Sequence, residues 1–337
     1  MKNTILAIMA VLPITMAAAV SAQDGIPRTP AGKPDFSGNY NISSLTPFQR
    51  PESYGNRLYL SDEEAEAMRE REFTTRADGE RPADLDGGLP EKGGNVGGFN
   101  DFWMDRGNDG FAIDGKYRTS ILTYPENGRM PERTEAGKEK QANAPRWVWP
   151  QRDGAWWLET GDTPYDGPEN QQLAVRCIYN ATSSIAIRPK PWANMKTIVQ
   201  TDDYMMLYIE SMHWARIIRI DAEHKSSELA SLDGDSIGWW EEDTLVVETT
   251  NFLDAPFQPS AGRRVVERFS PLDEGGLLYS FTVEDPDYEG PYSGELVWPK
   301  SDQQFYEFAC HEGNYSMAMI LRGARLREIE WREANKQ

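Results

Sequence analysis

Histidine and carboxylate side chains lie close together at two places in the chain, and both places have the residue types that proton transfer needs. At the first, His213 follows Glu210 and precedes Arg216, in a stretch that we expect to bend between two strands. A carboxylate can raise the pKa of a nearby imidazole and orient it, while an arginine can hold an anionic substrate or intermediate. The pattern predicts a catalytic group, with a histidine satisfied by hydrogen bonds within a turn as the structural alternative.

The second place is Cys310-His311-Glu312, which precedes a predicted helix N-terminus where the helix dipole favours a carboxylate. His311 and Glu312 are therefore a second candidate acid–base pair, unless Glu312 only caps the helix and His311 only fills a turn. The chain has two cysteines, and an even count in an exported protein predicts a disulfide, here Cys177 to Cys310. A metal-binding or nucleophilic thiol is the competing interpretation.

A serine motif offers a third kind of chemistry. Gly234-Asp235-Ser236-Ile237-Gly238 matches the G-x-S-x-G pattern of serine hydrolases, which requires a strand before the serine and a helix after it. The residues that follow indicate a hairpin instead. A plain turn into a strand is thus favoured over a Ser236 nucleophile, and a serine hydrolase is kept as the weaker alternative.

Metal and cofactor chemistry have little support in the sequence. The three histidines show no paired spacing, and His224 lies in a polar run that we expect to be an exposed loop. The segment that begins at Asp105 starts like a calcium-binding EF-hand loop, but Gly107 and Lys116 stand where oxygen ligands are needed. We therefore predict no metal site and no cofactor.

Tryptophans are numerous and could bind a flat ligand. Trp239 and Trp240 are adjacent, so on a strand one ring faces the core and the other faces outward or into a pocket. Together with Trp214 they form the predicted ligand-binding set, whose rings suit sugars, aromatic compounds or flat apolar molecules. Core packing is the alternative function of these rings.

The N-terminus and the charge of the chain indicate where it works. Residues 1–22 combine Lys2, an apolar run and a Val20-Ser21-Ala22 end, which is typical of a cleaved secretory signal peptide and too short for a membrane anchor. The formal net charge of −19 repels nucleic acids and anionic lipids. We predict a periplasmic or secreted bacterial protein with a small-molecule ligand, no nucleic-acid partner, no stable membrane insertion and no evident protein partner.

Two regions follow the signal peptide. Residues 23–151 are rich in proline, glycine and charge and predict an irregular wrap. They include one helix with a capping box at Ser61 and Glu64 that runs to about Glu72. Residues 152–337 predict a β-barrel-like domain that ends in a short helix, capped by Asn314 and running to about Ala334.

Short runs rich in β-branched and aromatic residues alternate with turn residues in the second region. The predicted strands are Thr197–Gln200, Met205–Glu210, Ala215–Asp221, Ile237–Trp240, Leu245–Thr250, Val265–Phe269, Leu277–Val283, Gly294–Trp298 and Phe305–Ala309. Consecutive hairpins close most economically as a barrel because closure removes exposed edges. The expected fold is mainly β, an antiparallel meander that closes as a lipocalin-like barrel or curled sheet.

Several motifs together resemble a widespread family of exported bacterial proteins without assigned function. They are Asp105-Arg106-Gly107, Gly115-Lys116-Tyr117-Arg118-Thr119-Ser120, Asn127-Gly128-Arg129-Met130-Pro131, Gly234-Asp235-Ser236, Asp243-Thr244-Leu245-Val246-Val247-Glu248-Thr249 and Cys310-His311-Glu312-Gly313-Asn314-Tyr315. The resemblance spans most of the mature chain and implies a bacterial periplasmic setting, without naming a catalytic residue. Glu242 stands where the family usually has a glycine.

Two functions from different classes fit these features. The first is an enzyme that acts on a small molecule by acid–base catalysis, as a lyase, isomerase or hydrolase. The second is a non-catalytic, lipocalin-like binder of an apolar, aromatic or sugar ligand. Convergence of two titratable side chains in one pocket would favour catalysis, and an aromatic-lined pocket without them would favour binding.

Overall fold

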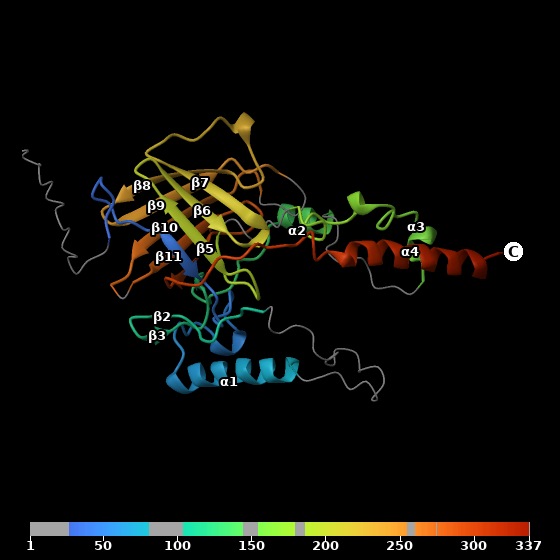
Figure 1. Cartoon of the computed structure of the whole chain (residues 1–337), viewed down its shortest axis with the longest axis horizontal. Coiled ribbons are helices and arrows are strands. Elements are labelled where there is room, and N and C mark those ends of the chain that lie inside the picture. The colour runs from blue at the N-terminus through green and yellow to red at the C-terminus, as the bar shows by residue number, and fades with distance from the viewer. Residues whose placement is uncertain are drawn as a thin grey trace, which may run out of the picture.

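The computed structural model describes residues 27–80, 104–143, 154–178, 186–254, 260–273 and 275–336. The predicted signal peptide, residues 1–22, lies outside the described residues. A ten-stranded sheet curls into a half-barrel, as expected from the sequence (Figure 1). Its order is β1-β5-β6-β7-β8-β9-β10-β11-β12-β4, and β2 and β3 form a separate small hairpin.

Eight of the nine predicted strands are present, with ends within two residues of the predicted ones. The strands are β1 (Gly38–Asn41), β2 (Ala112–Ile113), β3 (Lys116–Tyr117), β4 (Leu122–Tyr124), β5 (Met195–Gln200), β6 (Tyr204–Ile209), β7 (Trp214–Ile220), β8 (Asp235–Glu241), β9 (Thr244–Thr250), β10 (Arg264–Pro271), β11 (Leu277–Glu284) and β12 (Tyr292–Trp298). The predicted N-terminal wrap supplies both end strands of the sheet order, β1 and β4.

Alternation of side chains builds the core on the concave face of the half-barrel. Along β11, Leu277, Tyr279, Phe281 and Val283 are buried while the residues between them are partly exposed. This period of two is what a sheet with one covered face requires. The wrap completes the core from the other side, with residues that include Phe36, Tyr40, Ile42, Phe111 and Ile121.

One pair of strands departs from the expected antiparallel meander. β7 and β8 are parallel, with Ile218 opposite Ser236 and Ile220 opposite Gly238. Residues 221–234 connect them, a length that suits the crossover which parallel neighbours need. The expected antiparallel meander implied antiparallel pairing here, because sequence alone does not show that the chain crosses over before it pairs.

The prediction of a last strand at Phe305–Ala309 was wrong. The described residues 301–309 have no regular secondary structure, although the Phe305 ring packs against Tyr208 with 4.9 Å between centroids. β4 pairs with β12 on the side where a following strand would add, so that edge is already occupied. Just before this segment, Pro299 and Ser301 form backbone hydrogen bonds to Asn41 and Asn39 of β1. The end strand β1 therefore meets the segment that follows β12.

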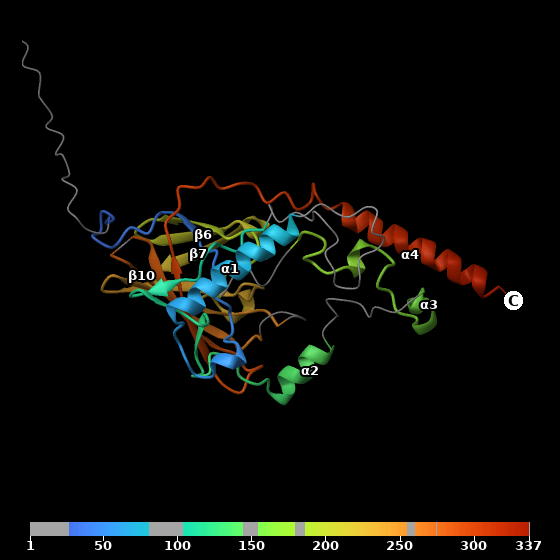
Figure 2. The ribbon, with the colours of Figure 1, turned by 90° about the horizontal axis from the view of Figure 1, so that it is seen from below.

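The helices lie outside the half-barrel (Figures 1 and 2). They are α1 (Asp62–Gly79), α2 (Glu135–Asn143), α3 (Trp156–Thr160) and α4 (Tyr315–Ala334), and short 3-10 turns occur at Glu52–Tyr54, Pro168–Asn170, Ser211–His213 and Ser227–Leu229. The capping box of Ser61 and Glu64 is confirmed, and α1 continues beyond the predicted Glu72. Asn314 caps α4 by accepting a hydrogen bond from the backbone N–H of Met317, 3.3 Å away.

The predicted disulfide between Cys177 and Cys310 is present. It ties the segment after α3 to the segment before α4. Asn314 strengthens this junction because its amide donates to the carbonyl of Val175 at 2.8 Å. Among the described helices, none is long and apolar enough to cross a membrane.

Glu242 occupies the first position of the two-residue loop between β8 and β9, where its φ is 53°. A type II′ turn takes glycine at this position because a Cβ atom is strained at positive φ. We expect Glu242→Gly to raise the free energy of unfolding by about 1 kcal/mol, measured by urea denaturation. An unchanged or lower denaturation midpoint would argue against strain in this turn.

Candidate functional site

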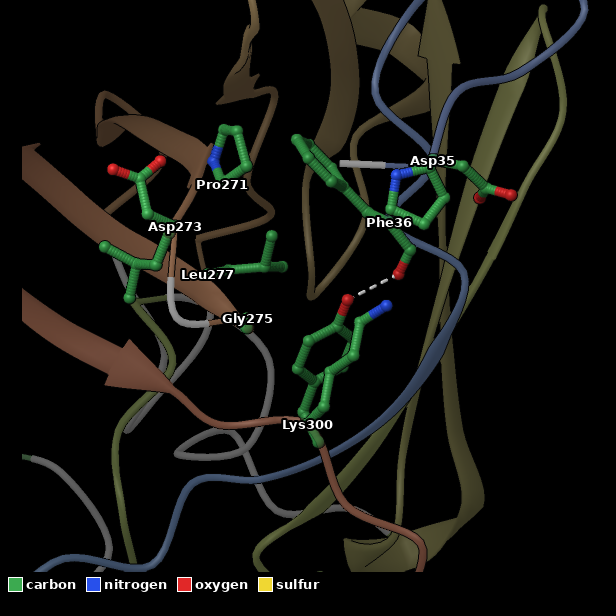
Figure 3. Close-up of a pocket in the computed structure, with 11 residues that line it drawn as sticks. Asp35, Phe36, Pro271, Asp273, Gly275, Leu277 and Lys300 are labelled. Atoms are coloured by element: carbon green, nitrogen blue, oxygen red, sulfur yellow. Dashed lines mark hydrogen bonds between the residues drawn. The ribbon is translucent and has the colours of Figure 1, made fainter. Parts of the chain in front are cut away.

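A half-open cavity of about 580 Å³ lies where β1 meets the segment that follows β12. Three parts of the chain line it: the segment leading into β1, the turn between β10 and β11, and the segment after β12 (Figure 3). The lining residues are Pro27, Asp35, Phe36, Tyr40, Pro271, Leu272, Asp273, Gly275, Gly276, Leu277 and Lys300. A cavity of this size suits a small organic molecule.

The β10–β11 turn holds one wall of the cavity in place. The backbone N–H of Leu272 donates to the carbonyl of Gly276, and that of Gly275 donates to the carbonyl of Leu272. Gly276 has a φ of 90°, and a Cβ atom there would lie 2.5 Å from the carbonyl oxygen of Trp298. The turn can therefore pass this close to the end of β12 only with glycine at this position.

Phe36 and Tyr40 form the opposite wall. The Tyr40 hydroxyl donates to the carbonyl of Phe36 at 2.7 Å, the dashed line in Figure 3. Gln200 of β5 accepts a hydrogen bond from the backbone N–H of Phe36 at 3.1 Å. Burial, with a smaller contribution from Asp35, raises the pKa of Tyr40, so its hydroxyl stays a neutral donor.

Charged groups lie at the edge of this mostly apolar lining. Lys300 extends its amine toward Phe36, whereas the carboxylates of Asp35 and Asp273 lie at the outer sides of the lining (Figure 3). Phe36, Pro271 and Leu277 lie around the space between them, although Phe36 and Leu277 are only 1% and 2% exposed. The cavity thus offers an apolar wall with a cation at its edge.

None of the five predicted acid–base residues is among the described residues that line this cavity. His213 is exposed and has a φ of 53°, and its ring contacts Phe308 with 6.4 Å between centroids. His311 and Glu312 are also exposed, in the turn between the disulfide and α4. Exposed groups of this kind do not form a desolvated catalytic centre by themselves.

Arg216 is buried inside the half-barrel in an ion pair with Glu267. The Arg216 guanidinium also donates to the hydroxyls of Ser236 at 2.9 Å and Thr249 at 2.8 Å. The Tyr279 hydroxyl donates to Glu267 at 2.7 Å and accepts from the backbone N–H of Ile187 at 2.9 Å. We call this set of contacts the interior polar network. It connects strands β7 to β11, and the Arg216 guanidinium binds to other side chains of the same chain.

Ser236 belongs to the same network and does not sit at an exposed turn. Its hydroxyl lies 2.9 Å from that of Thr249, so both Arg216 and Thr249 engage it. A nucleophilic serine needs a base within hydrogen-bond reach and access to substrate. The contacts of this buried hydroxyl are those of a structural serine.

The predicted ligand-binding tryptophans have three different environments. Trp240 backs the cavity wall, because its ring packs against Phe36 with 5.5 Å between centroids. Trp239 faces outward and donates to Glu241 at 3.2 Å. Trp214 is half-buried and packs against the main core. Of the three, Trp240 is thus the one with a contact to a cavity-lining residue.

A second cluster of titratable groups lies at the start of β5. Lys196 is 3% exposed, and its amine donates to the carbonyls of Ala193 and Met195. Burial lowers the pKa of Lys196 to about 7, with a smaller effect from the nearby Lys190. Burial also raises the pKa of Glu210, whose carboxylate accepts from the backbone N–H of Met195 at 3.1 Å.

Sequence reasoning missed Lys196, although a signal was available. Lys196 and Ile198 lie two residues apart on β5 and so point to the same face of the sheet. An inward Ile198 therefore implies an inward Lys196.

His224, which we expected to be exposed and without a role, was also misjudged. It is half-buried, with Asp235 3.0 Å from Nδ1 and Glu248 3.2 Å from Nε2. Both ring nitrogens are occupied, which fits a structural bridge between β8 and β9.

Over the described ranges, no group of three or more His, Cys, Asp or Glu side chains is arranged to hold a metal ion. Comparison with known proteins gives no family for the chain: no family model matches it, and no curated protein matches it.

Proposed function

We propose that this protein is an exported binder that holds a small amphipathic molecule in the cavity between β1 and the β10–β11 turn, without changing it chemically. One observation carries the proposal: the cavity has an aromatic and aliphatic wall, while the predicted acid–base residues lie elsewhere. Pockets of this kind use apolar contact for affinity and a few polar groups for orientation.

The lining also suggests the class of ligand. Phe36, Pro271 and Leu277 suit a flat or chain-like apolar body, and Lys300 suits an anionic group at one end of it. The carboxylates of Asp35 and Asp273 are turned to the outer sides and leave the middle of the lining apolar. We therefore favour an aromatic or aliphatic anion over a sugar.

The setting follows from the disulfide and the predicted signal peptide. A Cys177–Cys310 bridge persists in an oxidising compartment, such as the bacterial periplasm or the extracellular medium. The resemblance to exported bacterial proteins supports the periplasm.

Two fluorescent probes with similar apolar bodies test the role of Lys300. 1-Anilinonaphthalene-8-sulfonate carries an anion, and N-phenyl-1-naphthylamine is neutral. We expect Lys300→Gln to weaken binding of the sulfonate about fivefold, which corresponds to about 1 kcal/mol for an exposed charge pair, and to leave the neutral probe unaffected. Fluorescence titration measures both affinities.

Lys138→Gln is the matched control, because Lys138 is an exposed lysine on α2. It should bind both probes like the unaltered protein. Equal weakening of both probes by Lys300→Gln, or no saturable binding of either, would overturn the assignment. Mass spectrometry of the recovered probe separates binding from turnover, since a pure binder returns it unchanged.

Acid–base catalysis is the second candidate, because burial moves the pKa values of Glu210 and Lys196 toward neutrality. This enzyme would use Glu210 with Lys196, in place of the exposed His213 and His311. A group that titrates near pH 7, as Lys196 does, can both give and accept protons. A small molecule recovered with altered mass, and its loss in Glu210→Gln, would favour this candidate over the binder.

A further inference from the structure

The C-terminal helix α4 carries exposed apolar side chains along one face. Tyr315 is 77% exposed, Met319 64%, Leu326 52% and Ile329 49%. These four residues, with Arg322 among them, make up what we call the α4 stripe. Large apolar groups that are this exposed and lie in one line are unusual on a monomeric protein.

The opposite face of α4 is already occupied, which fixes the direction of the stripe. Ala324 packs with Trp156 and Trp157 of α3, and Glu328 accepts a hydrogen bond from the Trp157 indole at 3.0 Å. Trp331 donates to Glu159 at 3.1 Å. The helix therefore cannot turn its stripe inward without breaking these contacts.

The spacing of the stripe is that of a coiled coil. Tyr315, Met319, Arg322, Leu326 and Ile329 are separated by four, three, four and three residues, and Glu333 continues the series. Such four–three spacing brings all positions to one seam, where they meet the matching seam of another helix. A polar residue between the apolar residues of the seam, here Arg322 between Met319 and Leu326, is a device that selects one register.

Charge indicates what covers the stripe. The whole chain has a formal net charge of −19, which disfavours an anionic membrane as the surface that covers the stripe. α4 is different, because its four arginines nearly balance its three glutamates. Arg322 lies at the middle of the stripe and Glu330 directly after its last residue, Ile329, so a suitably shifted antiparallel copy of the same helix brings opposite charges together.

We propose that α4 pairs with α4 of a second copy of this protein in an antiparallel arrangement. In this register Met319 faces Ile329 of the second copy, and Leu326 faces the aliphatic part of Arg322. The Arg322 side chain leans toward the N-terminus of its own helix, as helical side chains do, and so approaches Glu330 of the other copy. Twofold symmetry makes each contact twice.

The arrangement of the molecule allows this pairing. Both ribbon views show α4 extending from one end of the molecule, with α3 beside it and the half-barrel away from its far end (Figures 1 and 2). A seam from one 20-residue helix is smaller than a standard protein–protein interface, so the dimer is weak and depends on concentration.

Sedimentation velocity of the full mature chain, from micromolar to near-millimolar concentration, tests the pairing. We expect the unaltered protein to shift from monomer to dimer, and Leu326→Glu to weaken dimerisation at least tenfold. Arg327→Gln changes the net charge by the same one unit away from the stripe and should dimerise normally.

A charge exchange tests the register. Arg322→Glu alone should weaken the dimer, and the double variant Arg322→Glu with Glu330→Arg should restore it. A protein that stays monomeric at all concentrations would overturn the proposal, as would dimerisation unaffected by Leu326→Glu. Sedimentation with anionic phosphatidylglycerol vesicles, prevented by Leu326→Glu, would instead assign the stripe to a membrane surface. Neither result bears on ligand binding at Lys300.

Discussion

Glu267→Ala is expected to lower the free energy of unfolding by about 3–5 kcal/mol, the range for breaking a buried ion pair. Glu267 is 0% exposed and Arg216 is 4% exposed, so the variant leaves a guanidinium in the core without its carboxylate. The Tyr279 hydroxyl would also lose its acceptor. Chemical denaturation followed by tryptophan fluorescence measures the change.

The double variant Arg216→Met with Glu267→Leu is the control, because it removes both charges and fills similar volume. Its stability should lie closer to that of the unaltered protein than to that of Glu267→Ala, since no charge remains buried alone. If Glu267→Ala and the double variant lose the same amount, packing and not the uncompensated charge causes the loss.

Between pH 7 and pH 9, Lys196→Met is expected to gain about 2 kcal/mol less free energy of unfolding than the unaltered protein gains. The folded pKa of about 7 lies below the ordinary value of 10.5. Between these values the unfolded chain holds a proton that the folded protein releases. Stability from this group therefore increases as pH rises from 7 toward 10.5, and it is lowest where Lys196 is charged when folded.

The measurement is the free energy of unfolding of both proteins at pH 7, 8 and 9. The variant also loses two hydrogen bonds to carbonyls, but that loss is the same at every pH, so the difference in slope isolates the titration. Lys190, whose pKa burial lowers to about 8, titrates in both proteins, so only its smaller coupling to Lys196 differs between them. Parallel pH curves would contradict a neutral Lys196 amine.

The strands were predictable because each has one buried face, and burial imposes an alternation that the sequence carries directly. Leu277, Tyr279, Phe281 and Val283 are a clear case. The parallel pairing of β7 with β8 was not predictable, because the direction of pairing depends on the path of the connection between the two strands. The failure at Phe305–Ala309 has a similar cause, since β4, from a distant part of the sequence, occupies the edge of β12.

Only part of the candidate site could be anticipated. Trp240 and the glycine-containing turn after β10 were identified from local patterns. Phe36, Tyr40 and Lys300 were not, because they come together only when β1 meets the segment after β12. For the histidines, rarity and charged neighbours could be read from the sequence, but their burial could not. His213 and His311 are exposed, whereas His224 is held between carboxylates.

The contact between β1 and the segment that follows β12 also constrains how the chain folds. The hydrogen bond between Asn41 and Gln303 joins residues 262 positions apart, and β1 pairs with β5 across most of the N-terminal wrap. Contacts this distant in sequence form slowly, because a long loop must close first. All neighbours of β1 are present only once almost the whole polypeptide has been made. We therefore expect the cavity beside β1 to be among the last parts of the structure to form.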